Sequence, residues 1–343
     1  MCREPESRGR GRVAIIGGGA AGLAAAGYLA CAGYEIDIYD KLPMLGGLMM
    51  FAIPTLRVPR DSVIEGVEDL KTRFSIKIFT RVKVFADGAE RRDEGDEFVE
   101  RVEPLSRIIE SYDAVLIATG IWRSRKLGIE GEDSRGVFTA LEFLYHVRAY
   151  EHGLIDRAPE CGKKVVVVGA GLSAVDAAEQ ALELGAEEVY LVYRRTIREA
   201  PAGEYEIRRL IREGVKWIEL AQPTKIVARN GRVVGVEFVR MRLGEPDETG
   251  RPRPIPVPGT EFVLEADTVI VAVGEMPTPP IEKEFMGISL DKRGRIVVDE
   301  RMRTGNEKVF AAGDVVTGPS MIGRAFGSGL RAARFLDEYL RLR

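Results

Sequence analysis

The sequence is poor in cysteine, with three among 343 residues. Cys2, Cys31 and Cys161 lie too far apart in the chain to form a C-x-x-C pair or a cluster of metal ligands. Dithiol chemistry needs two neighbouring thiols, and a protein-bound iron–sulfur cluster needs four thiolates, so both are excluded within this chain. We therefore predict no metal site, and the few cysteines favour a reducing, cytoplasmic location.

Histidine is scarcer still, because His146 and His152 are the only two. Both fall in a predicted linker helix before a second domain, where solvated or capping roles are expected and catalysis is not. Uninterrupted apolar runs long enough to cross a bilayer are missing as well. The stretch from Val13 to Ala30 is broken by glycines, so we interpret it as part of the fold and not as a secretory signal.

Charge of one sign does not dominate, since 50 Lys and Arg face 53 Asp and Glu. Such a balance produces no strong field that attracts nucleic acid or an anionic membrane. The expected partners are therefore small molecules. The length exceeds that of one hydrophobic core and predicts two domains.

The N-terminal part contains a strand–turn–helix–strand pattern. Residues 12–17 form a short apolar run that ends in glycine, and residues 20–32 are small residues and helix formers. Gly33 is expected to end this helix, and residues 35–39 alternate between polar and apolar as a strand does. This is one βαβ unit.

The pattern returns about 150 residues later with a strand, a helix, a glycine stop and a second strand. These elements are predicted at residues 164–168, 172–184, Gly185 and 189–193. The repetition predicts an α/β fold with two Rossmann-like three-layer dinucleotide-binding domains.

Two further buried strands, over residues 111–120 and 269–274, end in A-T-G and A-V-G and are expected to mark crossings between the domains. The first domain then comprises residues 1–122 and 276–343, and the second, residues 123–275, is inserted into it.

Two stretches are predicted as solvated loops or hairpin tips. Residues 87–103 are dense in charged side chains, and residues 244–258 are rich in glycine and proline.

The first turn carries the spacing G-x-G-x-x-G, formed by Gly17, Gly19 and Gly22 between a strand and a helix. These glycines permit a tight turn, close approach of a pyrophosphate and close packing of helix on strand. Asp40 ends the next strand, where a carboxylate accepts hydrogen bonds from a ribose that carries no 2′-phosphate. A ligand-free glycine turn is the alternative that this context disfavours.

The second turn repeats the spacing with Gly169, Gly171 and Ala174. Its following strand ends in Arg194 and Arg195, whose guanidinium groups suit a phosphate and favour NADPH over NADH. The alternative is a solvated charged edge that includes Arg198, with NADH as the donor.

Several longer segments match one known family. They are K-L-P-M-L-G-G-L at 41–48 with F-A-I-P at 51–54, V-Y-R-R at 192–195 with A-P-A-G-E-Y-E at 200–206, G-E-P-D-E-T-G-R at 244–251, and A-A-G-D at 311–314 followed by G-P-S-M-I-G-R-A-F. From about Arg12 to its end, the chain resembles the small (beta) subunit of glutamate synthase and its relatives, within the two-dinucleotide flavoproteins related to the pyridine nucleotide-disulphide reductases. Ala200 departs from the family, in which a Met commonly precedes this proline.

The resemblance implies FAD in the first domain, with Asp314 bonded to the ribityl chain, although a helix N-cap is the alternative role for that residue. The implied FAD residues are Gly17, Gly19, Ala20, Ala21, Gly22, Asp40, Lys41, Gly46, Gly47, Leu48, Ile53, Val84, Ala118, Thr119, Gly120, Gly313, Asp314, Met321 and Ile322. The implied NADPH residues are Gly169, Gly171, Leu172, Ser173, Ala174, Arg194, Arg195, Ala272, Val273 and Gly274.

The predicted function is hydride transfer from NADPH to FAD without a dedicated catalytic side chain, followed by electron transfer to an external acceptor. Glutamate synthase relatives usually carry an N-terminal iron–sulfur domain, and because about eleven residues precede the first strand, we expect that domain to be absent. The acceptor is left open among an iron–sulfur protein such as ferredoxin, a small molecule and a glutamate synthase large subunit. A ferredoxin–NADP reductase-type enzyme and a non-catalytic nucleotide-binding subunit or redox sensor are alternatives, and the sequence is compatible with a homo-oligomer.

Overall fold

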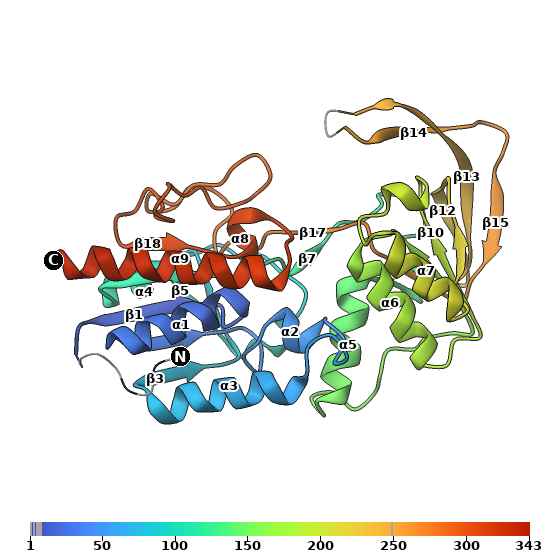
Figure 1. Cartoon of the computed structure of the whole chain (residues 1–343). Helices are drawn as coiled ribbons and strands as arrows, with labels where there is room; N and C mark the ends of the chain where they lie inside the picture. Colours follow the sequence, from blue (N-terminus) through green and yellow to red (C-terminus); the bar gives the residue numbers. More distant parts are fainter. Residues whose placement is uncertain (1, 3, 5–8, 248–249) are drawn as a thin grey trace. The chain divides into compact units, whose positions relative to one another are not determined.

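The computed structural model describes residues 2, 4, 9–247 and 250–343. The chain divides into two compact units. Unit 1 comprises Met1–Arg123 and Glu275–Arg343, and unit 2 comprises Ser124–Gly274. Unit 2 thus interrupts unit 1 in the chain, and Figure 1 shows it in green to orange.

Unit 1 is built on a five-stranded parallel sheet with the strand order β18-β6-β1-β2-β3. Apart from the edge strand β3, its apolar strands are buried on both faces, as in other doubly wound sheets. The strands are β1 (Arg12–Ile16), β2 (Glu35–Tyr39), β3 (Ile76–Phe79), β6 (Ala114–Ile117) and β18 (Val309–Ala311). Beside it, β4 (Val82–Phe85) pairs in parallel with β5 (Arg101–Pro104).

Helices cover both faces of this sheet. The long α1 and α9 pack against each other and share one core with the sheet, while α4 packs into a second core. In Figure 1 the blue α1 and the red α9 run alongside one another. The helices of unit 1 are α1 (Ala20–Ala32), α2 (Leu48–Phe51), α3 (Arg60–Arg73), η1 (Asp96–Phe98), α4 (Leu105–Ser111), α8 (Asp314–Thr317) and α9 (Ile322–Arg341).

Unit 2 repeats the plan with the parallel order β11-β10-β9-β16-β8. Three helices pack on one face of the sheet, and antiparallel strands pack on the other. The elements are β8 (Val137–Thr139), α5 (Ala140–Glu151), β9 (Lys164–Val168), α6 (Leu172–Glu183), β10 (Glu188–Val192), η2 (Ile197–Glu199), α7 (Glu204–Arg212), β11 (Lys216–Ile218), β12 (Ala221–Arg229), β13 (Arg232–Pro246), β14 (Pro252–Pro256), β15 (Phe262–Glu265) and β16 (Thr268–Val271). Two-residue strands, β7 (Arg123–Ser124) and β17 (Glu275–Met276), stand at the chain crossings between the units.

The β13–β14 hairpin extends the antiparallel layer, and Figure 1 shows it in yellow and orange. Prolines alternate along β14 at positions 252, 254 and 256. The Val257 N–H donates to the Arg240 carbonyl at 2.9 Å. The backbone N–H and C=O groups of the odd-numbered residues of this strand therefore point toward β13. The prolines, which have no N–H, consequently occupy the outward-facing positions.

Most predicted elements are confirmed. The helix at residues 20–32 matches α1, and Gly33 ends it with φ 96° in the left-handed region. Residues 244–258 do form a hairpin, of which residues 248 and 249 lie outside the described part. The predicted strand over 111–120 is shorter, because α4 continues to Ser111 and β6 begins at Ala114.

Two predictions on loops and linkers are wrong, one of them in part. His146 lies within α5 and His152 ends it, yet α5 is not a linker helix, because Phe143 and Val147 pack into the core of unit 2. For residues 87–103 the predicted solvated loop is wrong only for the buried part of the segment. The segment contains η1 and part of β5, and Asp93 within it is 7% exposed.

The cysteines are also paired differently from the expectation. Cys2 and Cys31 form a disulfide with their Cα atoms 5.8 Å apart, which joins Cys2 to the last turn of α1. The distance between the two cysteines in the sequence did not indicate this pairing. They are close in space because the residues before β1 lie at the end of α1, where the Arg10 N–H donates to the Gly33 carbonyl. Cysteine usage therefore does not support a reducing location. No helix among the described residues has the length and apolar character that crossing a membrane requires.

Thiol counting tests this arrangement. Burial raises the pKa of the Cys161 thiol to about 11, so at pH 8 almost none of it is thiolate, the reactive form. We expect native protein to react negligibly with a thiol reagent, unfolded protein to release one thiol, and unfolded, reduced protein to release three. Three thiols in unfolded protein that was never reduced would contradict the disulfide.

Candidate functional site

The glycine turn of unit 1 lies at a topological switch point of its sheet. β2 lies on one side of β1 and β6 on the other, so the chain leaving β1 enters a crevice at the carboxyl ends of the strands. Gly17 adopts φ 103°, and a Cβ there would lie 2.4 Å from the Ala118 carbonyl oxygen. This position requires glycine for the fold itself.

The other two glycines of the turn, Gly19 and Gly22, differ in the reason why the position is glycine. A Cβ at Gly22 would lie 1.9 Å from the Gly17 carbonyl oxygen, so α1 packs directly on the turn. Gly19 has an ordinary φ of −78°, and the nearest atom to its Cβ position is 3.9 Å away. Neither backbone strain nor packing explains why this residue is glycine, whereas close approach of a ligand does.

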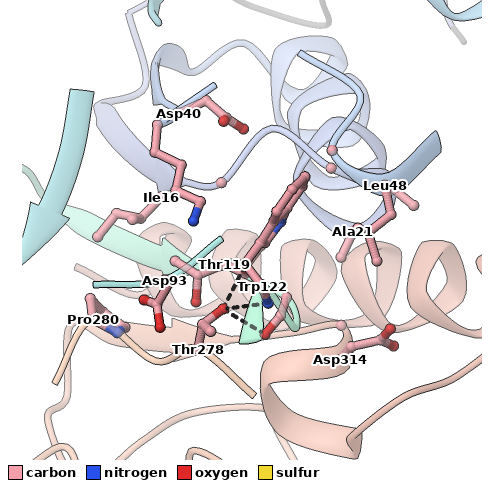
Figure 2. Close-up of a pocket in the computed structure, with 18 of the residues that line it drawn as sticks. Ile16, Ala21, Asp40, Leu48, Asp93, Thr119, Trp122, Thr278, Pro280 and Asp314 are labelled. Carbon is pink, nitrogen blue, oxygen red and sulfur yellow. Dashed lines mark hydrogen bonds between the residues drawn. The ribbon is translucent and has the colours of Figure 1, made fainter. Parts of the chain in front are cut away.

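Unit 1 contains an open pocket in front of this turn. The apolar wall and the few polar groups that converge on it are typical of a cofactor site. Figure 2 shows Asp40, Leu48 and Asp314 around it, contributed by segments far apart in the sequence. Of the residues assigned to FAD, those that line the pocket are Gly17, Gly19, Ala20, Ala21, Asp40, Lys41, Gly46, Gly47, Leu48, Ile53, Val84, Ala118, Thr119, Gly120, Gly313, Asp314 and Ile322.

Two of the assigned residues do not line the pocket. Gly22 lies behind the turn and serves the packing of α1 on β1. Met321 precedes α9 and is 60% exposed, so its side chain faces solvent. Its assignment as a flavin neighbour is not supported, because the wall at this point is formed by Ser320, Ile322 and Ala325.

Asp40 is a buried carboxylate at the end of β2. Its Oδ2 accepts from the Gly18 N–H at 2.6 Å, and its Oδ1 accepts from the Leu42 N–H at 2.8 Å. Burial raises the pKa of Asp40, and these two backbone donors oppose the shift. Each carboxylate oxygen still has capacity for a second donor, which a ribose hydroxyl provides.

Asp314 occupies the opposite part of the pocket wall (Figure 2). It is the first residue of α8 and not its N-cap, which is Gly313. The Ser320 hydroxyl donates to Asp314 Oδ1 at 2.5 Å, and burial raises the pKa of Asp314. The capping alternative is therefore wrong, and this carboxylate is positioned to accept from a ligand hydroxyl.

A cluster of buried charges forms a further part of the wall, which the sequence did not predict. Arg91 holds Asp93 through two nitrogens at 3.0 Å and donates to the Pro279 carbonyl at 2.8 Å. Lys83 and Lys41 both pair with Asp96. Desolvation of such charges is costly, and their pairing and hydrogen bonds offset that cost, so this charged stretch can fold inward.

Thr278 closes the same part of the wall. Its hydroxyl accepts from the Trp122 N–H at 3.1 Å and donates toward the carbonyls of Thr119 and Gly120 (Figure 2). It thereby connects the two segments of unit 1 that flank the inserted unit 2. No sequence motif distinguishes this threonine.

Unit 2 repeats the turn geometry. β9 lies between β10 and β16, and a Cβ at Gly169 would lie 2.2 Å from the Ala272 carbonyl oxygen. Gly171 has a φ of −85° and no atom within 4 Å of its Cβ position, as expected where a ligand approaches closely. Ala174 is fully buried, so the third position tolerates a methyl group here.

Both helices behind these turns begin at glycine and lack a side-chain cap, namely α1 at Gly19 and α6 at Gly171. By contrast, α5 begins with a capping box formed by Thr139 and Glu142. The N–H groups of the first turns of α1 and α6 are thus left for an anion. Leu172 and Ser173 lie in that first turn.

The arginines after β10 divide into two kinds. Arg195 is 5% exposed, donating to the Pro252 carbonyl at 2.7 Å and to Asp247 at 3.0 Å, so it fastens the hairpin. Arg194 and Arg198 are exposed. The prediction that Arg195 is a phosphate ligand does not fit these contacts, and Arg194 is the better candidate.

The remaining predicted residues of unit 2 lie after β16. Ala272 is buried, Val273 is 38% exposed, and Gly274 adopts φ 110°. The Arg125 N–H donates to the Gly274 carbonyl at 2.8 Å. Within the described ranges, no group of three or more His, Cys, Asp or Glu side chains is arranged to hold a metal ion.

Comparison with known proteins gives a consistent result. Residues 11–329 match the family model described as pyridine nucleotide-disulphide oxidoreductase. The chain is 41% identical, over 96% of its length and 44% of the relative's, to the NADP(+)-dependent formate dehydrogenase subunit beta of Moorella thermoacetica. It is 35% identical, over 96% of its length and 68% of the relative's, to the glutamate synthase [NADPH] small chain of Halomonas elongata.

Among solved structures, the fold matches FprA of Mycobacterium tuberculosis in complex with NADPH, with a TM-score of 0.78 and 21% identity over 97% of this chain and 85% of that one. The chain therefore spans less than half of the formate dehydrogenase subunit and about two thirds of the glutamate synthase chain.

Proposed function

The chain belongs to the pyridine nucleotide-disulphide oxidoreductase family, and on that basis we propose that it is an enzyme that oxidises NADPH, reduces FAD and passes the electrons to an external acceptor. The observation that carries the proposal is the pair Gly19 and Gly171. Each follows a strand at a switch point, has a negative φ that other residues also adopt, and has free space at its Cβ position. Close approach of a ligand therefore explains the glycine at both positions.

The residues of unit 1 fit FAD. Backbone N–H groups at the start of α1 bind the pyrophosphate, and the Asp40 carboxylate accepts from the adenosine ribose. Asp314, buried beside Ser320, accepts from the hydroxyls of the ribityl chain. The flavin supplies the redox chemistry, and the pocket wall aligns it and excludes water.

The residues of unit 2 fit NADPH. The first turn of α6, from Leu172 to Ala174, binds its pyrophosphate, and Arg194 binds the 2′-phosphate. Arg195 positions the neighbouring hairpin through Asp247. Both relatives above carry NADP or NADPH in their names, which supports this assignment of the donor.

The acceptor lies outside the described part of the chain. The Cys2–Cys31 disulfide lies at the end of α1 remote from Gly19, about 18 Å along the helix, and is unsuited to relay electrons from the pocket. The two relatives are named for different overall reactions. An iron–sulfur protein or a partner subunit is the class of acceptor that we propose, because single electrons leave a reduced flavin readily.

Anaerobic titration with NADPH tests the proposal. FAD-loaded protein is expected to lose its visible flavin absorbance with one equivalent of NADPH, and NADH is expected to act far more slowly. Purified protein that takes up no FAD would refute the enzyme assignment. FAD that binds but is never reduced would favour a non-catalytic nucleotide-binding subunit.

A further inference from the structure

One face of α9 carries an apolar stripe that begins in the wall of the pocket. Ile322 lines the pocket, and Phe326 and Leu330 follow it at four-residue spacing. Phe326 is 47% exposed and Leu330 is 38% exposed, while Met321 next to the start of the stripe is 60% exposed. Large apolar side chains gathered in this way mark an interaction site more often than scattered ones do.

The segment around the stripe is basic. Residues 318–334 contain Arg324, Arg331 and Arg334 and no Asp or Glu, whereas the whole chain has a net charge of −3. Arg334 is paired with Glu338. Arg324 and Arg331 have no carboxylate partner within the described part of the chain, and Arg331 donates to the Glu300 backbone carbonyl instead.

Some other arginines of unit 1 are neutralised, although the exposed Arg92, Arg293 and Arg301 are not paired with a carboxylate in the described part of the chain. Arg73 pairs with Asp69, Arg303 with Asp299, and Arg343 with Glu307. What distinguishes the stripe is that Arg324 and Arg331, to which the described residues offer no carboxylate, lie on the same helix as its exposed apolar side chains.

A second segment of the pocket wall shows the same character. Ile53 lines the pocket, and three residues further on Leu56 is 83% exposed. Residues 54–60 contain Arg57 and Arg60 and no acidic residue. Apolar groups accompanied by arginine are typical of the central part of protein–protein interfaces.

Building on the proposed function, we propose that the α9 stripe, with Arg324 and Arg331, is the docking surface for an acidic iron–sulfur electron carrier. A protein acceptor has to approach the pocket that holds the flavin, and the stripe starts at that pocket. The two arginines attract an acidic partner and orient it, while Phe326 and Leu330 bury apolar area in the complex. For each NADPH oxidised, two carriers each gain one electron and one proton is released.

The test uses FAD-loaded protein with an acidic two-cluster ferredoxin as the probe, and menadione, a neutral quinone, as the small acceptor. Calorimetry measures binding of the oxidised ferredoxin, and NADPH oxidation measures turnover with each acceptor. Arg324→Glu is expected to weaken ferredoxin binding about tenfold at low ionic strength and to leave menadione reduction unchanged. The affinity of the unaltered protein should fall steeply with added salt.

The matched control is Lys77→Glu, which makes the same charge change at an exposed position of β3. It should leave ferredoxin binding unaltered. Phe326→Ala should weaken binding without changing its salt dependence. Equal effects of Arg324→Glu and Lys77→Glu would overturn the inference, as would NADPH–menadione activity without any ferredoxin binding.

Two other occupants of this face give distinct results. Sedimentation that shows self-association abolished by Phe326→Ala would assign the face to a second copy of the chain, and co-flotation with anionic vesicles would assign it to a membrane surface. Either result overturns the inference. Absence of NADPH–menadione activity in the unaltered protein refutes the proposed function instead, and direct binding still decides the docking surface.

Discussion

A Gly19→Val variant is expected to fold normally and to take up no FAD. The backbone at Gly19 has an ordinary φ, and apart from its chain neighbours the nearest atom to its Cβ position is 3.9 Å away, so the Cβ of valine is accommodated. Its side chain then occupies the space through which the pyrophosphate reaches the first turn of α1. We expect FAD affinity to fall at least 100-fold, a loss of about 2.7 kcal/mol or more in binding free energy.

Flavin content, a FAD titration and far-UV circular dichroism measure the outcome. Gly171→Val is the mirror variant, because it should retain FAD and lose reduction by NADPH. Gly66→Ala is the control. Gly66 lies on the exposed face of α3 with no atom within 4 Å of its Cβ position, so this variant should leave FAD binding intact. If Gly19→Val retains full flavin content, the pyrophosphate does not bind at this turn.

Replacement of Arg194 by alanine is expected to raise the KM for NADPH about 10- to 100-fold, with kcat and the KM for NADH nearly unchanged. A guanidinium group that contacts the 2′-phosphate stabilises the ground state and the transition state equally, so its loss appears in KM. Charge-assisted hydrogen bonds of this kind contribute about 1.5–3 kcal/mol, which corresponds to that range.

Arg195→Ala separates the phosphate contact from the hairpin contact. It removes the hydrogen bonds to Pro252 and Asp247 and leaves a cavity at a position that is 5% exposed, so we expect a lower melting temperature and parallel changes with NADPH and NADH. If Arg195→Ala selectively raised the KM for NADPH and Arg194→Ala left it unchanged, Arg195 would be the phosphate ligand and Arg194 would not.

Much of the fold is predictable because its signals are local. The run of small residues at 20–32, closed by Gly33, specifies α1 without any knowledge of its neighbours. The glycine spacing and the strand-end position of Asp40 likewise predict that Gly17, Gly19 and Asp40 line one pocket, as they do. Each of these inferences depends on residues within one short stretch of the chain, the longest of which runs from Gly17 to Asp40.

What the sequence did not predict depends on long-range pairing. Arg91 and Asp93 look like solvated charges until the Pro279 carbonyl, 188 residues away from Arg91, completes their environment. Arg195 resembles a phosphate ligand until Asp247 and Pro252 are brought beside it. Charged residues carry no local signal for burial, because only their tertiary partners determine it.

The alternating prolines of β14 have a consequence for how this protein behaves when concentrated. A free strand edge normally offers a row of N–H groups on which a second molecule can template its own strand. With prolines at 252, 254 and 256 facing outward, this edge has no N–H donor at those positions, and the Pro252 carbonyl is already bonded to Arg195. An intermolecular ladder would thus lack half of its hydrogen bonds, so the projecting hairpin is protected against aggregation through its own edge.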